Sequence, residues 1–166
     1  MKNVYKVVLI SLAVLGVVYA DTKPDVLTQD KRNKELVRWA VNALNRGDWE
    51  AMKSLYSPRF VQHSPASQKP IGWEDYELGC RITYKKLPGL RRRIEDIIAE
   101  GDKVAVRLTL SATFTSNKGT RYEKKKTIEM TEIDIIRIAH GLIVEEWVEC
   151  DTKQAERFVI AMKYGW

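Results

Sequence analysis

The sequence contains few of the residues on which metal enzymes and nucleophilic enzymes depend. Its two cysteines and two histidines do not have the spacing of a zinc site. It has no Gly-rich phosphate-binding loop and no local signature of Ser-His-Asp or Cys-His catalysis, although such side chains could still meet in the folded protein. We therefore expect no metal ion and no cofactor. A disulfide between Cys80 and Cys150 is allowed but not implied, because they fall in different expected elements.

Long apolar runs are absent after the first twenty residues. Lys2 and Lys6 precede the apolar run Val7–Ala20, whose end fits a small-residue cleavage site. This pattern predicts a signal peptide over residues 1–20, so we expect a secreted or periplasmic mature protein. A membrane anchor is the alternative, but the run is shorter than the roughly 20 residues of a spanning helix. Membrane contact is therefore expected only through the uncleaved signal sequence.

The composition is that of one globular domain, expected over residues 30–166 after a polar lead-in at 21–29. Hydrophobic residues make up 45% and charged residues 30% of the chain, which excludes a disordered protein. The net charge of +6 is too weak to imply nucleic acid, and no recognition motif is present. The basic runs Lys85–Lys86, Arg91–Arg93 and Lys124–Lys126 are expected on a solvated face, with an anionic membrane or glycan surface as the alternative.

The first half of the domain predicts helices. Apolar residues lie on one stripe of a helix over Asp30–Arg46, and Gly47 ends it. A short helix over Trp49–Tyr56, a short strand over Phe60–His63 and a helix over Trp73–Lys86 follow. An amphipathic helix over Thr152–Met162 is expected at the end of the chain.

The second half predicts long strands joined by glycine turns. The expected strands are Arg91–Ala99, Lys103–Ser116, Arg121–Ile138 and Leu142–Cys150, with turns near Gly101, Asn117–Gly119 and Ala139–Gly141. Strands of this length must twist and bend. The fold class that follows is α+β, a cone-shaped, curved antiparallel sheet packed on the N-terminal helices, with a pocket inside.

The order of several short segments resembles that of SnoaL-like proteins, polyketide cyclase-type members of the nuclear transport factor 2-like superfamily. The segments are Asn33–Val37, Asn45–Trp49, Phe60–Pro65, Ile94–Ala105, Ile133–Ile138 and Gly141–Trp147. The resemblance covers about residues 30–155. It implies a cone-shaped barrel with an apolar pocket and a homodimer formed through the outer sheet face. It also implies ring closure by an intramolecular aldol reaction without metal or cofactor, with a pocket aspartate as general acid and base.

That aspartate aligns with Asp151, at the end of the last strand. A carboxyl group can move protons in this reaction if burial raises its pKa toward the working pH. Asp151 is therefore a candidate catalytic residue, and an N-cap of the following helix is its alternative role. His63, on the short strand beside Pro65, is a candidate donor or proton relay at the pocket mouth, with a structural histidine as the alternative.

Six further residues are candidates for the substrate-binding wall. Glu149 shares strand parity with Trp147 and Asp151, so it points into the pocket if Trp147 does; an exposed glutamate is the alternative. Aromatic residues could bind a flat ligand or simply form core. The six candidates are Trp39, Tyr56, Phe60, Cys80, Trp147 and Glu149.

These patterns favour a secreted SnoaL-like protein that binds a small, apolar, polyketide-like molecule. Cofactor-free acid/base chemistry of the aldol cyclase or isomerase type is expected, with Asp151 and His63 as its residues. The alternative function is a non-catalytic module that binds a small ligand or a protein on the same scaffold.

Overall fold

The computed structural model describes residues 28–65, 67–116, 119, 121 and 124–164. The predicted signal peptide, most of the lead-in and the turn at Asn117–Lys118 lie outside this range. Within it, no helix is both long and apolar enough to cross a membrane.

Local signals place the helices of the first half. Helix α1 (Gln29–Arg46) begins after Thr28, whose hydroxyl accepts from the Lys31 amide at 3.4 Å, and ends at Gly47 with φ +65°. Helix α2 (Trp49–Leu55) is capped by Asp48, which accepts from the Ala51 amide at 3.1 Å. Helix α3 spans Trp73–Lys86 and α4 spans Thr152–Tyr164. All four predicted helices are confirmed, with small shifts at their ends.

The strands form one six-stranded sheet. Their bounds are β1 Tyr56–His63, β2 Ile71–Gly72, β3 Arg91–Glu100, β4 Lys103–Ser116, β5 Lys124–Ala139 and β6 Leu142–Cys150. The order across the sheet is β2-β1-β6-β5-β4-β3. The predicted antiparallel meander from β3 to β6 is confirmed. The sheet is nevertheless mixed, because β1 pairs with β6 in parallel, a long-range pairing that sequence periodicity does not reveal.

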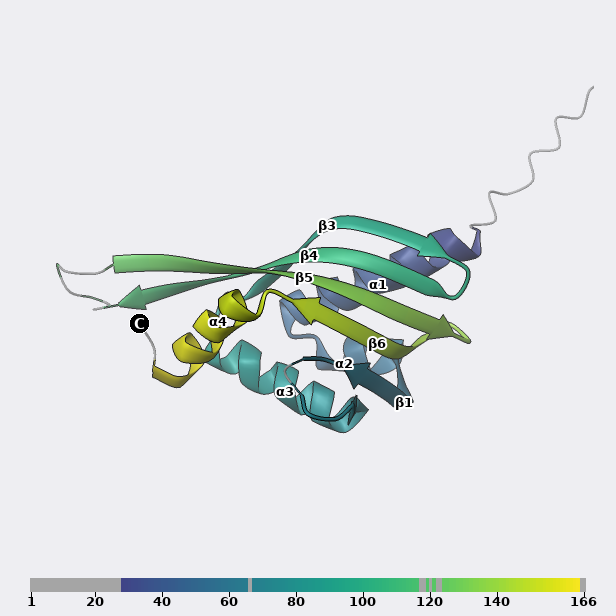
Figure 1. The fold of residues 1–166 in the computed structure, drawn as a ribbon, viewed down its shortest axis with the longest axis horizontal. Coiled ribbons are helices and arrows are strands. Elements are labelled where there is room, and N and C mark those ends of the chain that lie inside the picture. Colours follow the sequence, from purple (N-terminus) through teal and green to yellow (C-terminus); the bar gives the residue numbers. More distant parts are fainter. Residues whose placement is uncertain (1–27, 66, 117–118, 120, 122–123, 165–166) are drawn as a thin grey trace, which may run out of the picture.

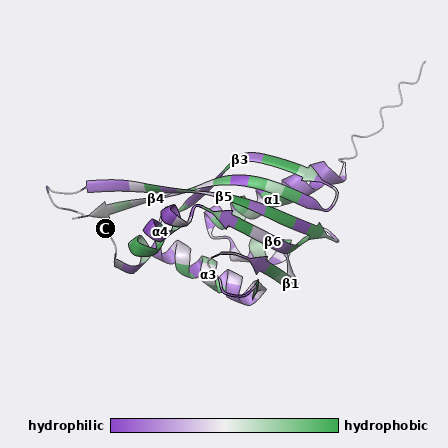
Figure 2. Ribbon diagram, viewed as in Figure 1, coloured by the Kyte–Doolittle hydropathy of each residue, from purple (hydrophilic) through white to green (hydrophobic). Residues whose placement is uncertain are grey.

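The helices cover one face of the curved sheet. In Figure 1, β3, β4 and β5 run across the top of the molecule while α2 and α3 lie beneath them, and β6 and β1 continue the sheet toward α3. Figure 2 shows apolar and polar residues alternating along the strands, as a sheet with one buried face requires. The fold class predicted from the sequence is thus confirmed.

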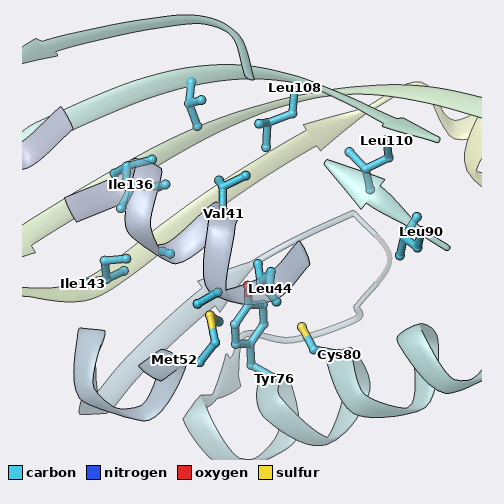
Figure 3. Close-up of a cluster of buried hydrophobic side chains, with 14 of the residues drawn as sticks. Val41, Leu44, Met52, Tyr76, Cys80, Leu90, Leu108, Leu110, Ile136 and Ile143 are labelled. Carbon is cyan, nitrogen blue, oxygen red and sulfur yellow. The ribbon is translucent and has the colours of Figure 1, made fainter. Parts of the chain in front are cut away.

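Strand alternation determines which residues face the helices. On β4 the buried side chains are Val104, Val106, Leu108, Leu110 and Ala112. Figure 3 shows Val41 and Leu44 of α1 between these strands and the side chains of Tyr76 and Cys80 on α3. Because paired residues lie on the same face, the register carries this buried face across to β5 and β6.

Candidate functional site

A cavity of about 370 Å³ lies between the buried sheet face and helices α1, α3 and α4. Most of its wall is apolar, from residues such as Val41, Leu44 and Leu108. The volume is within the range of pockets that hold small molecules. The polar residues of the wall come mainly from the strands and from α3, and its buried carboxyl groups all lie on β5 and β6.

Three buried carboxyl groups belong to this wall, and its fourth acid, Asp75 on α3, is exposed. Glu132 and Asp134 lie two positions apart on β5, and Glu146 lies on the neighbouring strand β6, paired with Ile136. Their exposed fractions are 8%, 4% and 4%. Carboxyl groups are rarely buried so completely, because removing their charge from water is costly. Their surroundings therefore determine their protonation.

Glu146 is poised to exchange a proton near neutral pH. Burial is the main cause that raises its pKa, from 4.5 to about 7, and the charge of Glu132 adds to the rise. Gln62 on β1 opposes it, because its Nε2 donates to Glu146 Oε2 at 2.8 Å and stabilises the carboxylate. A carboxyl group with a pKa near the working pH is effective as a general base or acid.

Asp134 has a raised pKa and one buried oxygen without a hydrogen-bond partner in the described part of the chain. Burial, followed by the charges of Glu132 and Glu146, raises its pKa well above the ordinary 3.8. Its Oδ1 has no hydrogen-bond partner among the described residues. A buried oxygen without a partner is unusual in a folded protein and is available to a ligand.

Arg92 supplies a half-buried positive charge at the same wall. It lies on β3, and its side chain reaches past β4 so that its Nε lies 3.9 Å from Glu132 Oε1. Its guanidinium carbon lies 6.0 Å from the ring centre of Tyr84 on α3, a cation–π distance. The prediction of a solvated face for the run Arg91–Arg93 is therefore confirmed for Arg91 and Arg93, which are exposed, and wrong for Arg92.

Two tyrosines and a cysteine, Tyr56, Tyr76 and Cys80, add further polar groups to the wall. The hydroxyls of Tyr56 and Tyr76 lie 3.5 Å apart. Burial raises the pKa of both tyrosines well above 10.0 and also raises the pKa of the Cys80 thiol. These groups are therefore neutral and act as hydrogen-bonding and apolar surface. Both Cys80 and Cys150 are free thiols in the structure.

Asp151 does not line the cavity. Its side chain is exposed, and its Oδ1 accepts from the Gln154 amide at 3.0 Å at the start of α4. The alternative role as a helix cap is thus confirmed. The alignment with SnoaL-like proteins placed the catalytic acid at Asp151, at the end of β6. The acid of β6 that faces the cavity is Glu146.

His63, Trp147 and Glu149 lie on the face of the sheet that points away from the cavity. His63 stacks on Trp147 with ring centres 5.4 Å apart, and its Nε2 lies 3.0 Å from Glu145 Oε1. Glu149 is exposed, and so is Ile133, the residue opposite it in the register of β5 and β6. The expectation that Trp147 points inward is wrong, because β6 directs residues 146, 148 and 150 into the cavity. The structure therefore does not bring His63, Glu149 and Asp151 together in the cavity.

The other predicted wall residues divide evenly. Tyr56 and Cys80 line the cavity. Phe60 is fully buried beside Tyr56 but belongs to the core behind the wall, with ring centres 5.0 Å apart. Trp39 is 59% exposed, on the side of α1 that faces solvent.

The acids of β5 could have been found from the sequence. Ile128, Met130, Ile136 and Ile138 share one strand parity and are buried. Glu132 and Asp134 occupy the two positions between them with the same parity. Two carboxyl groups that interrupt an otherwise apolar face are a signal of a polar site inside the fold.

The curved α+β sheet packed on helices around a cavity is the fold that the resemblance to SnoaL-like proteins implied. A family model described as SnoaL-like polyketide cyclase matches residues 34–157. The chain belongs to this family. No curated protein matches the chain.

Solved structures share the fold at low sequence identity. IdmH from Streptomyces antibioticus is 24% identical, with a TM-score of 0.66 over 76% of this chain and 97% of that one. TsrD from Streptomyces laurentii is 23% identical, with a TM-score of 0.63 over 80% and 97%. Bal32a, from a soil-derived mobile gene cassette, is 16% identical, with a TM-score of 0.65 over 79% and 98%. At these identities the likeness establishes the fold alone.

Proposed function

We propose that the cavity binds a small, largely apolar ligand and that Asp134 and Glu146 move protons on it without a cofactor. The chemistry is of the aldol cyclase or isomerase type. The observation that carries the proposal is the pair of carboxyl groups, each 4% exposed, in the wall of an otherwise apolar cavity. Membership of the SnoaL-like family supports it, as does the likeness to IdmH, for which polyketide cyclase activity has been proposed.

The proposed reaction begins with a ligand that has a hydrogen next to a carbonyl group. A carboxylate takes this hydrogen as a proton, the C–H electron pair forms a C=C bond, and the carbonyl oxygen becomes an enolate. In an aldol closure the enolate carbon then attacks a second carbonyl of the same ligand, and that oxygen receives the proton. Glu146 is the preferred base, because its pKa of about 7 leaves much of it ionised near neutral pH.

Exchange of the α protons of 1-tetralone for deuterium in D₂O, followed by NMR, tests the first step without knowledge of the natural substrate. We expect Asp134→Asn and Glu146→Gln to lower the catalysed rate by about 10²–10⁴-fold. Asp151→Asn is the matched control, because asparagine also caps helices and residue 151 lies outside the cavity. The proposal is wrong if both cavity variants exchange as fast as the wild type.

The second candidate is a binding module that performs no chemistry. The apolar wall favours it as much as it favours catalysis, since both need a bound apolar molecule. Binding of 1-tetralone without any catalysed exchange, in the wild type as in Asp134→Asn, would favour this candidate.

The expected homodimer and the expected export remain proposals. Ile98, Ile133 and Ile135 are 64%, 49% and 43% exposed on the outer sheet face, and this supports pairing through that face. Sedimentation of the Ile135→Lys variant tests it, because a lysine there should yield monomers. Export with removal of residues 1–20 is tested by sequencing the N-terminus of the protein recovered from the producing cells.

A further inference from the structure

Three buried polar atoms of the cavity wall have no hydrogen-bond partner in the described part of the chain. They are Asp134 Oδ1, Arg92 Nη1 and the hydroxyl oxygen of Tyr84. All three residues line the same cavity. Buried donors and acceptors are nearly always paired in folded proteins, so three at one wall indicate the place where the polar part of a ligand binds.

Arg92 has two charged or aromatic neighbours at the cavity wall and, within the described ranges, one buried nitrogen without a hydrogen-bond partner. Its Nε lies 3.9 Å from Glu132 Oε1, which is within reach of the charge but beyond a hydrogen bond. Its guanidinium group lies over the ring of Tyr84 at 6.0 Å. The guanidinium group lies between these two neighbours, and its buried Nη1 has no hydrogen-bond partner among the described residues.

We propose that Arg92 Nη1 and the Tyr84 hydroxyl bind the enolate oxygen of the ligand, while Asp134 and Glu146 hold the proton that was removed from its α carbon. This rests on the acid/base function proposed above. It fixes the orientation of the substrate, with its carbonyl oxygen toward β3 and α3 and its α carbon toward β5 and β6. Donors placed where charge develops stabilise the transition state without reorganisation of solvent.

The charges of the cavity select the class of substrate. A ligand with a permanent carboxylate would bring a negative charge beside Glu132, Asp134 and Glu146, which are balanced by Arg92 alone among the described wall residues. An enolate forms only as Glu146 accepts a proton, so the total charge inside the cavity does not change. The site therefore favours a neutral, enolisable ketone over a keto acid.

Binding of phenols tests this oxygen site independently of turnover, because a phenolate resembles an enolate in charge and shape. The probes are 4-nitrophenol and 4-nitroanisole, which differ only in whether the oxygen can lose a proton. Near pH 7, the pKa region of Glu146, we expect the wild type to prefer 4-nitrophenol by about tenfold or more. The visible spectrum of the bound probe should be that of the phenolate.

Variants of two adjacent arginines separate the site from general charge effects. Arg92→Met should reduce the preference to within about twofold and return the bound probe to its neutral spectrum. Arg92→Lys keeps the charge, guards against a folding defect, and should keep part of the preference. Arg93→Met is the matched control, because Arg93 is exposed on the opposite face of β3 and pairs with Glu95 at 2.7 Å. Tyr84→Phe should weaken the preference by a smaller factor than Arg92→Met.

Two results would overturn the oxygen site. One is equal affinity of the wild type for both probes, and the other is an unchanged preference in folded Arg92→Met. If the preference depends on Arg92 but 1-tetralone exchange is absent, the proposed catalysis fails and the oxygen site stands. If exchange depends on Asp134 and Glu146 but Arg92→Met leaves both preference and exchange rate unchanged, catalysis stands and the oxygen site fails.

Discussion

Gln62 donates a hydrogen bond of 2.8 Å to Glu146 across the parallel pairing of β1 and β6. This contact joins the only parallel strand pair of the described sheet to the carboxyl group with the pKa of about 7. The next residues in each strand, His63 and Trp147, stack on the other face. One step along the two strands therefore separates the interior of the cavity from the outer surface.

Removing the Gln62 amide should change the proton affinity of Glu146. The hydrogen bond stabilises the carboxylate, so Gln62→Met should raise the pKa of Glu146 above about 7. A ¹³C NMR titration of the glutamate carboxyl carbons measures it directly. Gln68→Met, in an exposed loop, is the control and should leave the titration unchanged. A pKa that falls in Gln62→Met would contradict the assigned role of this contact.

Glu146 should also make the folding stability depend on pH. The folded protein binds this proton more tightly than the unfolded chain, so the stability that Glu146 contributes is fully present below pH 4.5 and is lost as pH rises to about 7. The difference between these two values corresponds to roughly 3 kcal/mol.

Urea unfolding at pH values below and above this window measures the effect. Glu146→Gln should remove the part due to Glu146 and be more stable than the wild type above pH 7, since a neutral amide replaces a buried carboxylate. Asp134 has a raised pKa as well, so part of the dependence should remain. Equal pH dependence in the two proteins would argue against the raised pKa of Glu146.

Asp151 should matter for stability and not for chemistry. Asp151→Ala removes the acceptor for the Gln154 amide at the start of α4, which should cost about 1 kcal/mol in urea unfolding. Asp151→Asn should retain the cap. Neither variant should slow 1-tetralone exchange; slow exchange in Asp151→Asn would restore Asp151 as the candidate catalytic residue.

His63 should likewise be dispensable for proton transfer. Its Nε2 lies 3.0 Å from Glu145 on the outer face, where Arg137 also binds that carboxylate at 2.8 Å. The hydrogen bond from His63 is the first cause of the lowered Glu145 pKa, so His63→Gln should raise that pKa in the ¹³C titration. The exchange rate should stay at the wild-type value, and a loss of about tenfold or more would return His63 to the mechanism.

Much of the fold was predictable because the patterns are local. Gly47 ends α1, Asp48 caps α2, and the alternation on β4 identifies its buried face, each from a few neighbouring residues. The parallel pairing of β1 with β6 joins residues more than 80 positions apart and left no periodic signal.

The site was harder to predict because it depends on strand parity. Trp147 was a candidate for the pocket wall, but its ring packs against His63 outside the cavity. If the inward-facing parity of β6 is assigned the wrong way round, Glu149 is placed in the pocket instead of Glu146. Arg92 was missed for another reason, since it lies between two exposed arginines and only the tertiary fold shows that it reaches Glu132.

The pH dependence of 1-tetralone exchange, compared between Glu146→Gln and Glu149→Gln, is the most direct test of the assignment of chemistry to the inner face. We expect the wild-type rate to rise with pH around a midpoint near 7, as the Glu146 carboxyl ionises. Glu149→Gln should keep this profile, and Glu146→Gln should lose both the rate and the midpoint. A wild-type profile that survives in Glu146→Gln and disappears in Glu149→Gln would contradict it.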